Sequence, residues 1–106
     1  SCEEIRAMNV VDFLLPEQSS NVINHWLSKL RKNGTITVGG TDIWEISKLF
    51  YTGQINREQW VNLMYSGERR PSYTMLEMKV LLESKGLKVL RCLVDGIKFC
   101  VVAQRP

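Results

Sequence analysis

The chain has 106 residues, of which 44% are hydrophobic, 24% charged and 8% aromatic, and these values exclude disordered, collagen-like and low-complexity classes. The formal net charge is +3, with −1 on residues 1–53 and +4 on residues 54–106, an excess that argues only weakly for nucleic-acid binding. The apolar runs are too short to cross a bilayer and no secretory signal opens the chain, so we expect one cytoplasmic domain over residues 1–106.

The cysteines and the histidine indicate neither a disulfide framework nor a metal site. Cys2, Cys92 and Cys100 are odd in number and lack the spacing of a zinc site, so we expect reduced thiols in a cytosolic compartment. His25 is the only histidine and has no ligand partner at a useful spacing, so no metal is expected.

The N-terminal segment has the pattern of a strand followed by a helix. A short apolar run over residues 5–9 predicts a buried strand, and Pro16 prevents it from continuing as a central strand. Apolar residues at helical spacing then predict a helix over residues 20–32, with Ser19 or Ser20 capping its first turn.

A second strand follows this helix. Asn33-Gly34 is a left-handed helix stop, and the β-branched run Thr35–Val38 predicts a strand that Gly39-Gly40 ends. Because a helix joins the two predicted strands, we expect them to be parallel neighbours.

Three further helices are predicted in the middle of the chain. The first begins at Thr41 or Asp42, and the second covers residues 57–65 behind the cap residue Asn56. The third runs over residues 74–85 and opens with a capping box. The residues that we expect this third helix to bury include Leu76, Val80 and Leu81.

The C-terminal segment predicts a β-hairpin, because Asp95-Gly96 is a favoured two-residue turn between two apolar runs. A turn at this position places three cross-strand pairs on one apolar face: Val94 with Ile97, Cys92 with Phe99, and Leu90 with Val101. Cys92 and Cys100 then lie on opposite faces of the hairpin, which argues against a disulfide between them.

Two segments, residues 9–12 and residues 39–42, follow the predicted parallel strands, and ligands of such sheets bind beyond the carboxyl ends of the strands. Asp12 and Asp42 are therefore the carboxylates expected at one rim. Each is either a general base or ligand acceptor, or else a structural carboxylate, in a loop for Asp12 and as a helix cap for Asp42. The turn VGGTDI could present the N–H groups of Thr41 and Asp42 to an anion, but it matches neither GxGxxG nor GxxxxGK(S/T), and a tight strand-to-helix turn is the favoured interpretation. GxSxG, HExxH and Cys–His patterns are absent, so these residues alone identify no reaction.

Three segments together resemble a known family: IRAMNVVDFLLP, WLSKLRKNGTITVGGTD and LEMKVLLESKGLKVL. In this order they are similar to the C-terminal half of class I S-adenosylmethionine-dependent methyltransferases, and the subgroup looks like small predicted methyltransferases encoded near sugar and cell-surface genes. The resemblance implies an α/β fold with a partial Rossmann-like sheet of strand order 4-5-7-6, in which the last strand is antiparallel. It also implies that residues 51–73 form an acceptor-region insertion.

The resemblance assigns roles to nine positions but identifies no catalytic residue. The positions beside the methionine end of S-adenosylmethionine would be Asn9, Val10 and Asp12. Those bordering the methyl acceptor would be Gly40, Thr41, Asp42, Tyr65, Arg69 and Tyr73. Asp12 stands where the family often has Glu, and Phe13 replaces a frequent His. The glycine-rich cofactor loop and the acidic residue after the second family strand are absent from these residues, so we expect no cofactor binding by this segment alone.

The implied partners follow from the strand order. The strand within residues 5–10 is central in the family but would be an edge here, so we expect either a second copy of this chain or the missing N-terminal half to cover it. The implied function is the C-terminal part of a methyltransferase, acting on a small-molecule acceptor and inactive alone. The alternative is a non-catalytic dimerising or ligand-binding module of the same fold. Nucleic-acid binding has least support, because aromatic and basic residues do not interleave.

Overall fold

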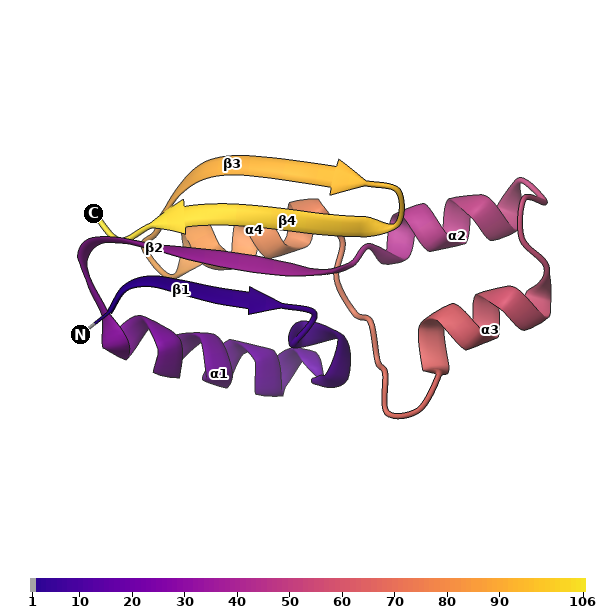
Figure 1. Ribbon diagram of the computed structural model, residues 1–106, viewed down its shortest axis with the longest axis horizontal. Coiled ribbons are helices and arrows are strands. Elements are labelled where there is room, and N and C mark those ends of the chain that lie inside the picture. The colour runs from indigo at the N-terminus through magenta and orange to yellow at the C-terminus, as the bar shows by residue number, and fades with distance from the viewer. Residues whose placement is uncertain (1) are drawn as a thin grey trace.

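The computed structural model describes residues 2–106. Four strands and four α-helices follow one another, with one short 3-10 helix after the first strand (Figure 1). The elements are β1 (Cys2–Met8), η1 (Val11–Phe13), α1 (Pro16–Lys29), β2 (Leu30–Thr41), α2 (Ile43–Tyr51), α3 (Arg57–Tyr65), α4 (Met75–Ser84), β3 (Lys88–Asp95) and β4 (Lys98–Gln104).

The four strands form one sheet in the order β1-β2-β4-β3. β1 is parallel to β2, while β4 is antiparallel to both of its neighbours. This order confirms the predicted 4-5-7-6 arrangement, with the last strand of the sequence as the antiparallel one. The helix between β1 and β2 makes the parallel pair possible, since a tight turn can join only antiparallel strands.

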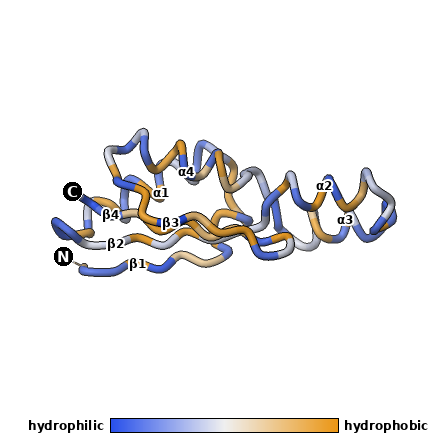
Figure 2. Tube along the Cα trace, turned by 90° about the horizontal axis from the view of Figure 1, so that it is seen from above, coloured by the Kyte–Doolittle hydropathy of each residue, from blue (hydrophilic) through white to orange (hydrophobic). Residues whose placement is uncertain are grey.

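Helices α1 and α4 cover one face of the sheet, and no helix within residues 2–106 covers the other (Figure 2). The core lies between these two helices and the sheet, and the buried side chains come from both layers. Its fully buried members include Ile23 from α1, Met78 and Leu82 from α4, Ile36 and Val38 from β2, and Phe99 and Val101 from β4. The fold is therefore two-layered, with an uncovered sheet face. No helix in residues 2–106 has the length and apolar character that crossing a membrane requires.

Helix α1 begins and ends earlier than the predicted range of residues 20–32. Pro16 occupies its first turn, where the missing N–H is not needed, and the side-chain oxygen of Gln18 accepts a hydrogen bond from Leu15 N at 2.8 Å. Ser19 is fully buried inside the helix rather than capping it. The prediction treated Pro16 only as a strand breaker and so placed the helix start too late.

Strand β2 is longer than predicted and contains the residue expected to stop α1. Asn33 has φ of 66°, but it lies within β2, where its N–H donates to the carbonyl of Arg105 at 2.8 Å. The left-handed residue therefore marks an irregularity in the sheet, and β2 continues through Gly39-Gly40 to Thr41.

Helix α4 buries a different stripe from the one predicted. Leu76 and Val80 are 62% and 61% exposed, whereas Met78 and Leu82 are fully buried and Leu81 packs against the core. Both pairs have the i, i+4 spacing of a helix face, so apolar character alone did not identify the inward one.

The hairpin of β3 and β4 is shifted by two residues from the predicted pairing. Its turn is Gly96-Ile97, with Gly96 at a φ of 61° as a tight hairpin turn requires, so Asp95 pairs with Lys98 and Cys92 with Val101. A two-residue shift preserves the faces, and Cys92 and Cys100 do lie on opposite ones. The ladder is irregular between Val89 and Arg91, where Leu90 is 48% exposed, and Val101 pairs with Cys92 instead of Leu90.

The remaining helix starts are as predicted. Asp42 caps α2, Asn56 caps α3 with a bond from Gln59 N at 2.8 Å, and Thr74 caps α4 in a reciprocal pair with Glu77. Helices α2 and α3 extend beyond the end of the sheet (Figure 1). Phe50 and Trp60 stack between them with ring centroids 5.5 Å apart.

The inward stripe of α4 can be tested with two substitutions of the same residue type. Leu82→Ala should lower the free energy of unfolding by about 2–5 kcal/mol, because it opens a cavity in the core. Leu76→Ala on the same helix should change it by no more than about 0.5 kcal/mol, because its side chain is exposed. Urea denaturation followed by circular dichroism measures both, and equal losses would contradict the orientation of α4.

Candidate functional site

Five polar side chains meet at the carboxyl ends of β1 and β2, and we call them the polar cluster. Its members are Asn9, Asp12, Thr41, Arg69 and Lys98. They come from the loop and 3-10 helix after β1, the last residue of β2, the loop between α3 and α4, and the first residue of β4. The site therefore lies where the parallel strands end and the α2–α3 segment begins.

Asp12 is the centre of the polar cluster and is only 2% exposed. One carboxylate oxygen accepts the backbone N–H of Thr41 at 2.8 Å, and the other accepts its hydroxyl at 2.7 Å. Gly40 permits this approach, because a Cβ there would lie 2.9 Å from the Asp12 Oδ1 atom. The carboxylate thus joins the segment after β1 to the end of β2.

Two cations compensate the buried carboxylate. Arg69 Nη2 donates to the Thr41 hydroxyl oxygen at 2.8 Å and lies 3.7 Å from Asp12 Oδ2. Lys98 Nζ donates to the same hydroxyl at 3.1 Å and lies 3.8 Å from the same carboxylate oxygen. A buried charge requires such partners. The hydroxyl of Thr41 donates once and accepts twice, so its hydrogen-bonding capacity is full.

Asn9 forms the rim of the polar cluster. It adopts a φ of 67°, a conformation that asparagine tolerates better than most residues, and its N–H donates to Gly39 O at 2.8 Å. Its exposed side chain accepts a hydrogen bond from Lys98 Nζ at 3.3 Å. Val10 follows it at the same rim and is 38% exposed.

Asp42 is buried as well, but it serves the fold. Its Oδ1 atom accepts the N–H groups of Trp44 and Glu45 at 2.9 and 3.2 Å, and its Oδ2 atom accepts the N–H of Met75 at 2.9 Å. Of the two readings left open by the sequence, the structure therefore shows the helix cap. This side chain ties the first turn of α2 to the first turn of α4.

The two tyrosines assigned to the acceptor side lie apart from the polar cluster. Tyr73 is only 9% exposed and belongs to the core, where its hydroxyl donates to Pro16 O at 3.3 Å. Tyr65 is exposed and packs edge-on against Trp60, with ring centroids 6.0 Å apart. The structure thus gathers Asn9, Asp12, Thr41 and Arg69 in the polar cluster, with Gly40 against Asp12, and leaves both tyrosines out of the cluster's hydrogen bonds.

Lys98 is the member that the sequence reasoning missed. It pairs directly with Thr41 across β2 and β4, so the register between these two strands, which the sequence did not supply, is what places it at the rim.

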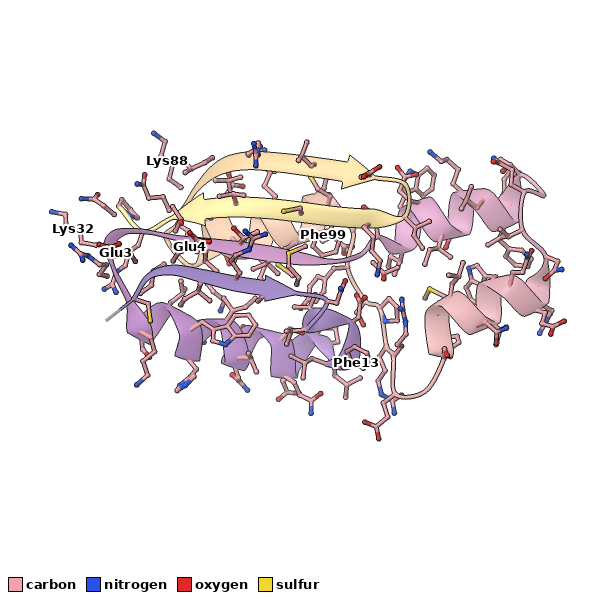
Figure 3. The ribbon with its side chains drawn as sticks, in the orientation of Figure 1. Glu3, Glu4, Phe13, Lys32, Lys88 and Phe99 are labelled. Atoms are coloured by element: carbon pink, nitrogen blue, oxygen red, sulfur yellow. The ribbon has the colours of Figure 1, made fainter. Side chains whose placement is uncertain are left out.

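The hollows found on this surface are separate from the polar cluster. One of about 270 Å³ is bordered by Glu3, Arg31 and Lys32 at the other end of the sheet, and Figure 3 shows Glu3 and Lys32 there, away from Phe99 and Phe13. In residues 2–106 no group of three or more His, Cys, Asp or Glu side chains is placed to hold a metal ion. The polar cluster, in contrast, offers hydrogen-bond donors of two cations to a ligand.

Comparison with known proteins reveals likeness in fold but not in sequence. The sequence matches no protein-family model, and no curated protein is similar to it. An O-methyltransferase family protein from Burkholderia thailandensis superposes with a TM-score of 0.71 at 12% identity. An O-methyltransferase family 2 protein from Planctomyces limnophilus, solved with apigenin, gives 0.68 at 14%. A SAM-dependent methyltransferase from Archaeoglobus fulgidus gives 0.64 at 11%.

The coverage of these matches is unequal. They include 97%, 98% and 97% of this chain, but only 30%, 30% and 59% of the respective methyltransferase chains. The chain therefore has the α/β fold of one part of a methyltransferase, which confirms the fold expected from the resemblance.

The support that Asp12 gives to the site can be measured through stability. Asp12→Asn replaces an oxygen acceptor with an NH2 group beside two cations, and should lower the free energy of unfolding by about 3 kcal/mol. Asp95→Asn, at the exposed end of β3, should change it by less than about 0.5 kcal/mol. Urea denaturation compares the two variants, and an unchanged midpoint for Asp12→Asn would mean that the buried carboxylate does not stabilise the fold.

Proposed function

We propose that this chain is the C-terminal part of an S-adenosylmethionine-dependent methyltransferase and is inactive alone. The observation that carries the proposal is the shared fold over 97–98% of the chain, with the polar cluster at the carboxyl edge where ligands of parallel sheets bind. Inactivity follows because these 106 residues contain no glycine-rich cofactor loop.

The residues present fit one side of a cofactor site. Asn9 and Val10 are exposed at the end of β1, so they are accessible to a ligand that lies along the carboxyl edge. The bound cofactor supplies an activated methyl group. The role of this chain is to position the acceptor next to it, through Arg69 and Lys98, which the buried Thr41 hydroxyl helps to hold in place.

Strand β1 supports the need for a further segment. It is at the edge of the sheet, where one row of its N–H and C=O groups has no partner strand within residues 2–106, and five of its seven residues are exposed. We propose that the N-terminal part of the enzyme, or in its absence a second copy of this chain, pairs with this edge.

One observation favours the alternative of a non-catalytic binding or dimerising module. The buried carboxylates of Asp12 and Asp42 each accept hydrogen bonds on both oxygens, so within residues 2–106 neither is free to act as a general base at the rim. Such a module would keep the fold and the polar cluster but would transfer no methyl group.

Binding of S-adenosylmethionine distinguishes these two functions. Titration calorimetry should detect no binding to the 106-residue chain, and micromolar binding to the polypeptide that the same reading frame encodes when extended upstream of residue 1. Tight binding by the 106-residue chain would show that the site is misplaced. A folded extended protein that binds no cofactor, or a start codon immediately upstream of residue 1, would favour the non-catalytic module.

The open edge of β1 can be tested by light scattering. Because Asn9 N–H points to β2, alternation along the strand directs the N–H of Arg6 and Met8 to the open side. The isolated chain should form a dimer, Arg6→Ala should keep it, and Arg6→Pro should be monomeric because it lacks the outward N–H. A monomeric parent chain, or dissociation caused equally by both variants, would contradict pairing through this edge.

A further inference from the structure

The polar cluster contains more positive than negative charge. Arg69 and Lys98 both lie within 4 Å of Asp12 Oδ2, at 3.7 and 3.8 Å, and this carboxylate is the one anion in the cluster. Asp95 is opposite Lys98 in the hairpin, but the ion pairs found in residues 2–106 do not include one between them. Asp42 uses both oxygens on backbone N–H groups. One unit of positive charge is therefore uncompensated.

The polar cluster also has more unused hydrogen-bond donors than unused acceptors. Both oxygens of Asp12 and the hydroxyl of Thr41 already accept hydrogen bonds from their neighbours. The cations still have donors to offer, since the five N–H groups of the Arg69 side chain make one hydrogen bond within residues 2–106. A ligand with acceptor oxygens and negative charge matches this arrangement, whereas a neutral donor group does not.

The two cations can be reached from solvent. The side chains of Arg69 and Lys98 are 23% and 44% exposed, although Asp12 and Thr41 beneath them are buried. The buried carboxylate thus fixes the two cations in position at the carboxyl edge of the sheet, where part of each side chain is exposed. This partly buried setting strengthens a charge-assisted hydrogen bond relative to one in open water.

We propose that Arg69 and Lys98 bind an anionic group of the methyl acceptor, a carboxylate or a phosphate. The inference rests on the proposed function and adds the chemical class of the acceptor to it. Held there, the anionic group would fix one end of the acceptor at the polar cluster, while Asn9 and Val10 border the position proposed for the cofactor.

Titration of the 15N-labelled chain with small anions tests this site. Benzoate and phenyl phosphate should shift the amide signals of residues 9, 41, 69 and 98 at millimolar concentrations, and the stronger of the two identifies the anionic group. Neutral benzamide should not shift them. Arg69→Gln and Lys98→Gln should each weaken binding about tenfold, as expected for the loss of a charge-assisted hydrogen bond. Lys98→Arg, which keeps the charge, should restore most of it.

Arg70 provides the matched control, because its exposed side chain adjoins Arg69 and forms no ion pair with Asp12. Arg70→Gln should leave binding within about twofold of the parent chain, as surface charges contribute little. The amide spectrum of each variant shows whether it is folded. Equal shifts with benzamide, or equal weakening by Arg70→Gln and Arg69→Gln, would overturn the proposal.

The cofactor titration of the extended protein keeps the two proposals separate. Cofactor binding without anion binding at the polar cluster would overturn the acceptor class and leave the methyltransferase proposal intact. Anion binding without cofactor binding would instead support an anion site in a non-catalytic module, and would overturn its assignment to a methyl acceptor.

Discussion

The buried carboxylate of Asp12 is the constraint on which the functional end of this fold depends. A carboxylate that is 2% exposed must be compensated, and its partners come from three distant parts of the chain. Thr41 is at the end of β2, Lys98 begins β4, and Arg69 is in the loop before α4. The N–H of Arg70 also bonds to the backbone carbonyl of Asp12, which fixes that loop twice. One charge thus brings together the parallel strands, the hairpin and the segment that carries α2 and α3.

The same arrangement explains how a structural cluster and a binding surface can coincide. The carboxylate is buried and accepts hydrogen bonds on both oxygens, while the two cations that compensate it are partly exposed to solvent. Asp42 carries out a related structural task nearby by joining the starts of α2 and α4. Strand β1 is at an edge of the sheet and one sheet face has no helix within residues 2–106, which agrees with our proposal that this chain supplies one side of a site.

Features that depend on residues close together in the sequence were predicted correctly. The errors concern features that depend on packing between distant segments. The caps Asp42, Asn56 and Thr74 act on their own first turns, so the sequence located them correctly. The inward stripe of α4 and the hairpin register depend on what each element packs against. In each case the predicted and the observed arrangement place equally apolar side chains inward, so the sequence pattern did not distinguish them. Lys98 was missed because the register between β2 and β4, which places it opposite Thr41, was not predicted. Asp12, in contrast, was identified because its position after β1 places it at the carboxyl edge, although its partners could not be known from spacing alone.

The central claim is that this chain is one part of a larger sheet whose open strand β1 pairs with a segment outside these 106 residues. Hydrogen exchange at the amides of Arg6 and Met8, in the polypeptide extended upstream of residue 1, tests it most directly. We predict that these outward amides exchange as slowly as that of Ala7, which points to β2. Exchange at the rate of an unpaired edge, in a folded extended protein, would contradict the account.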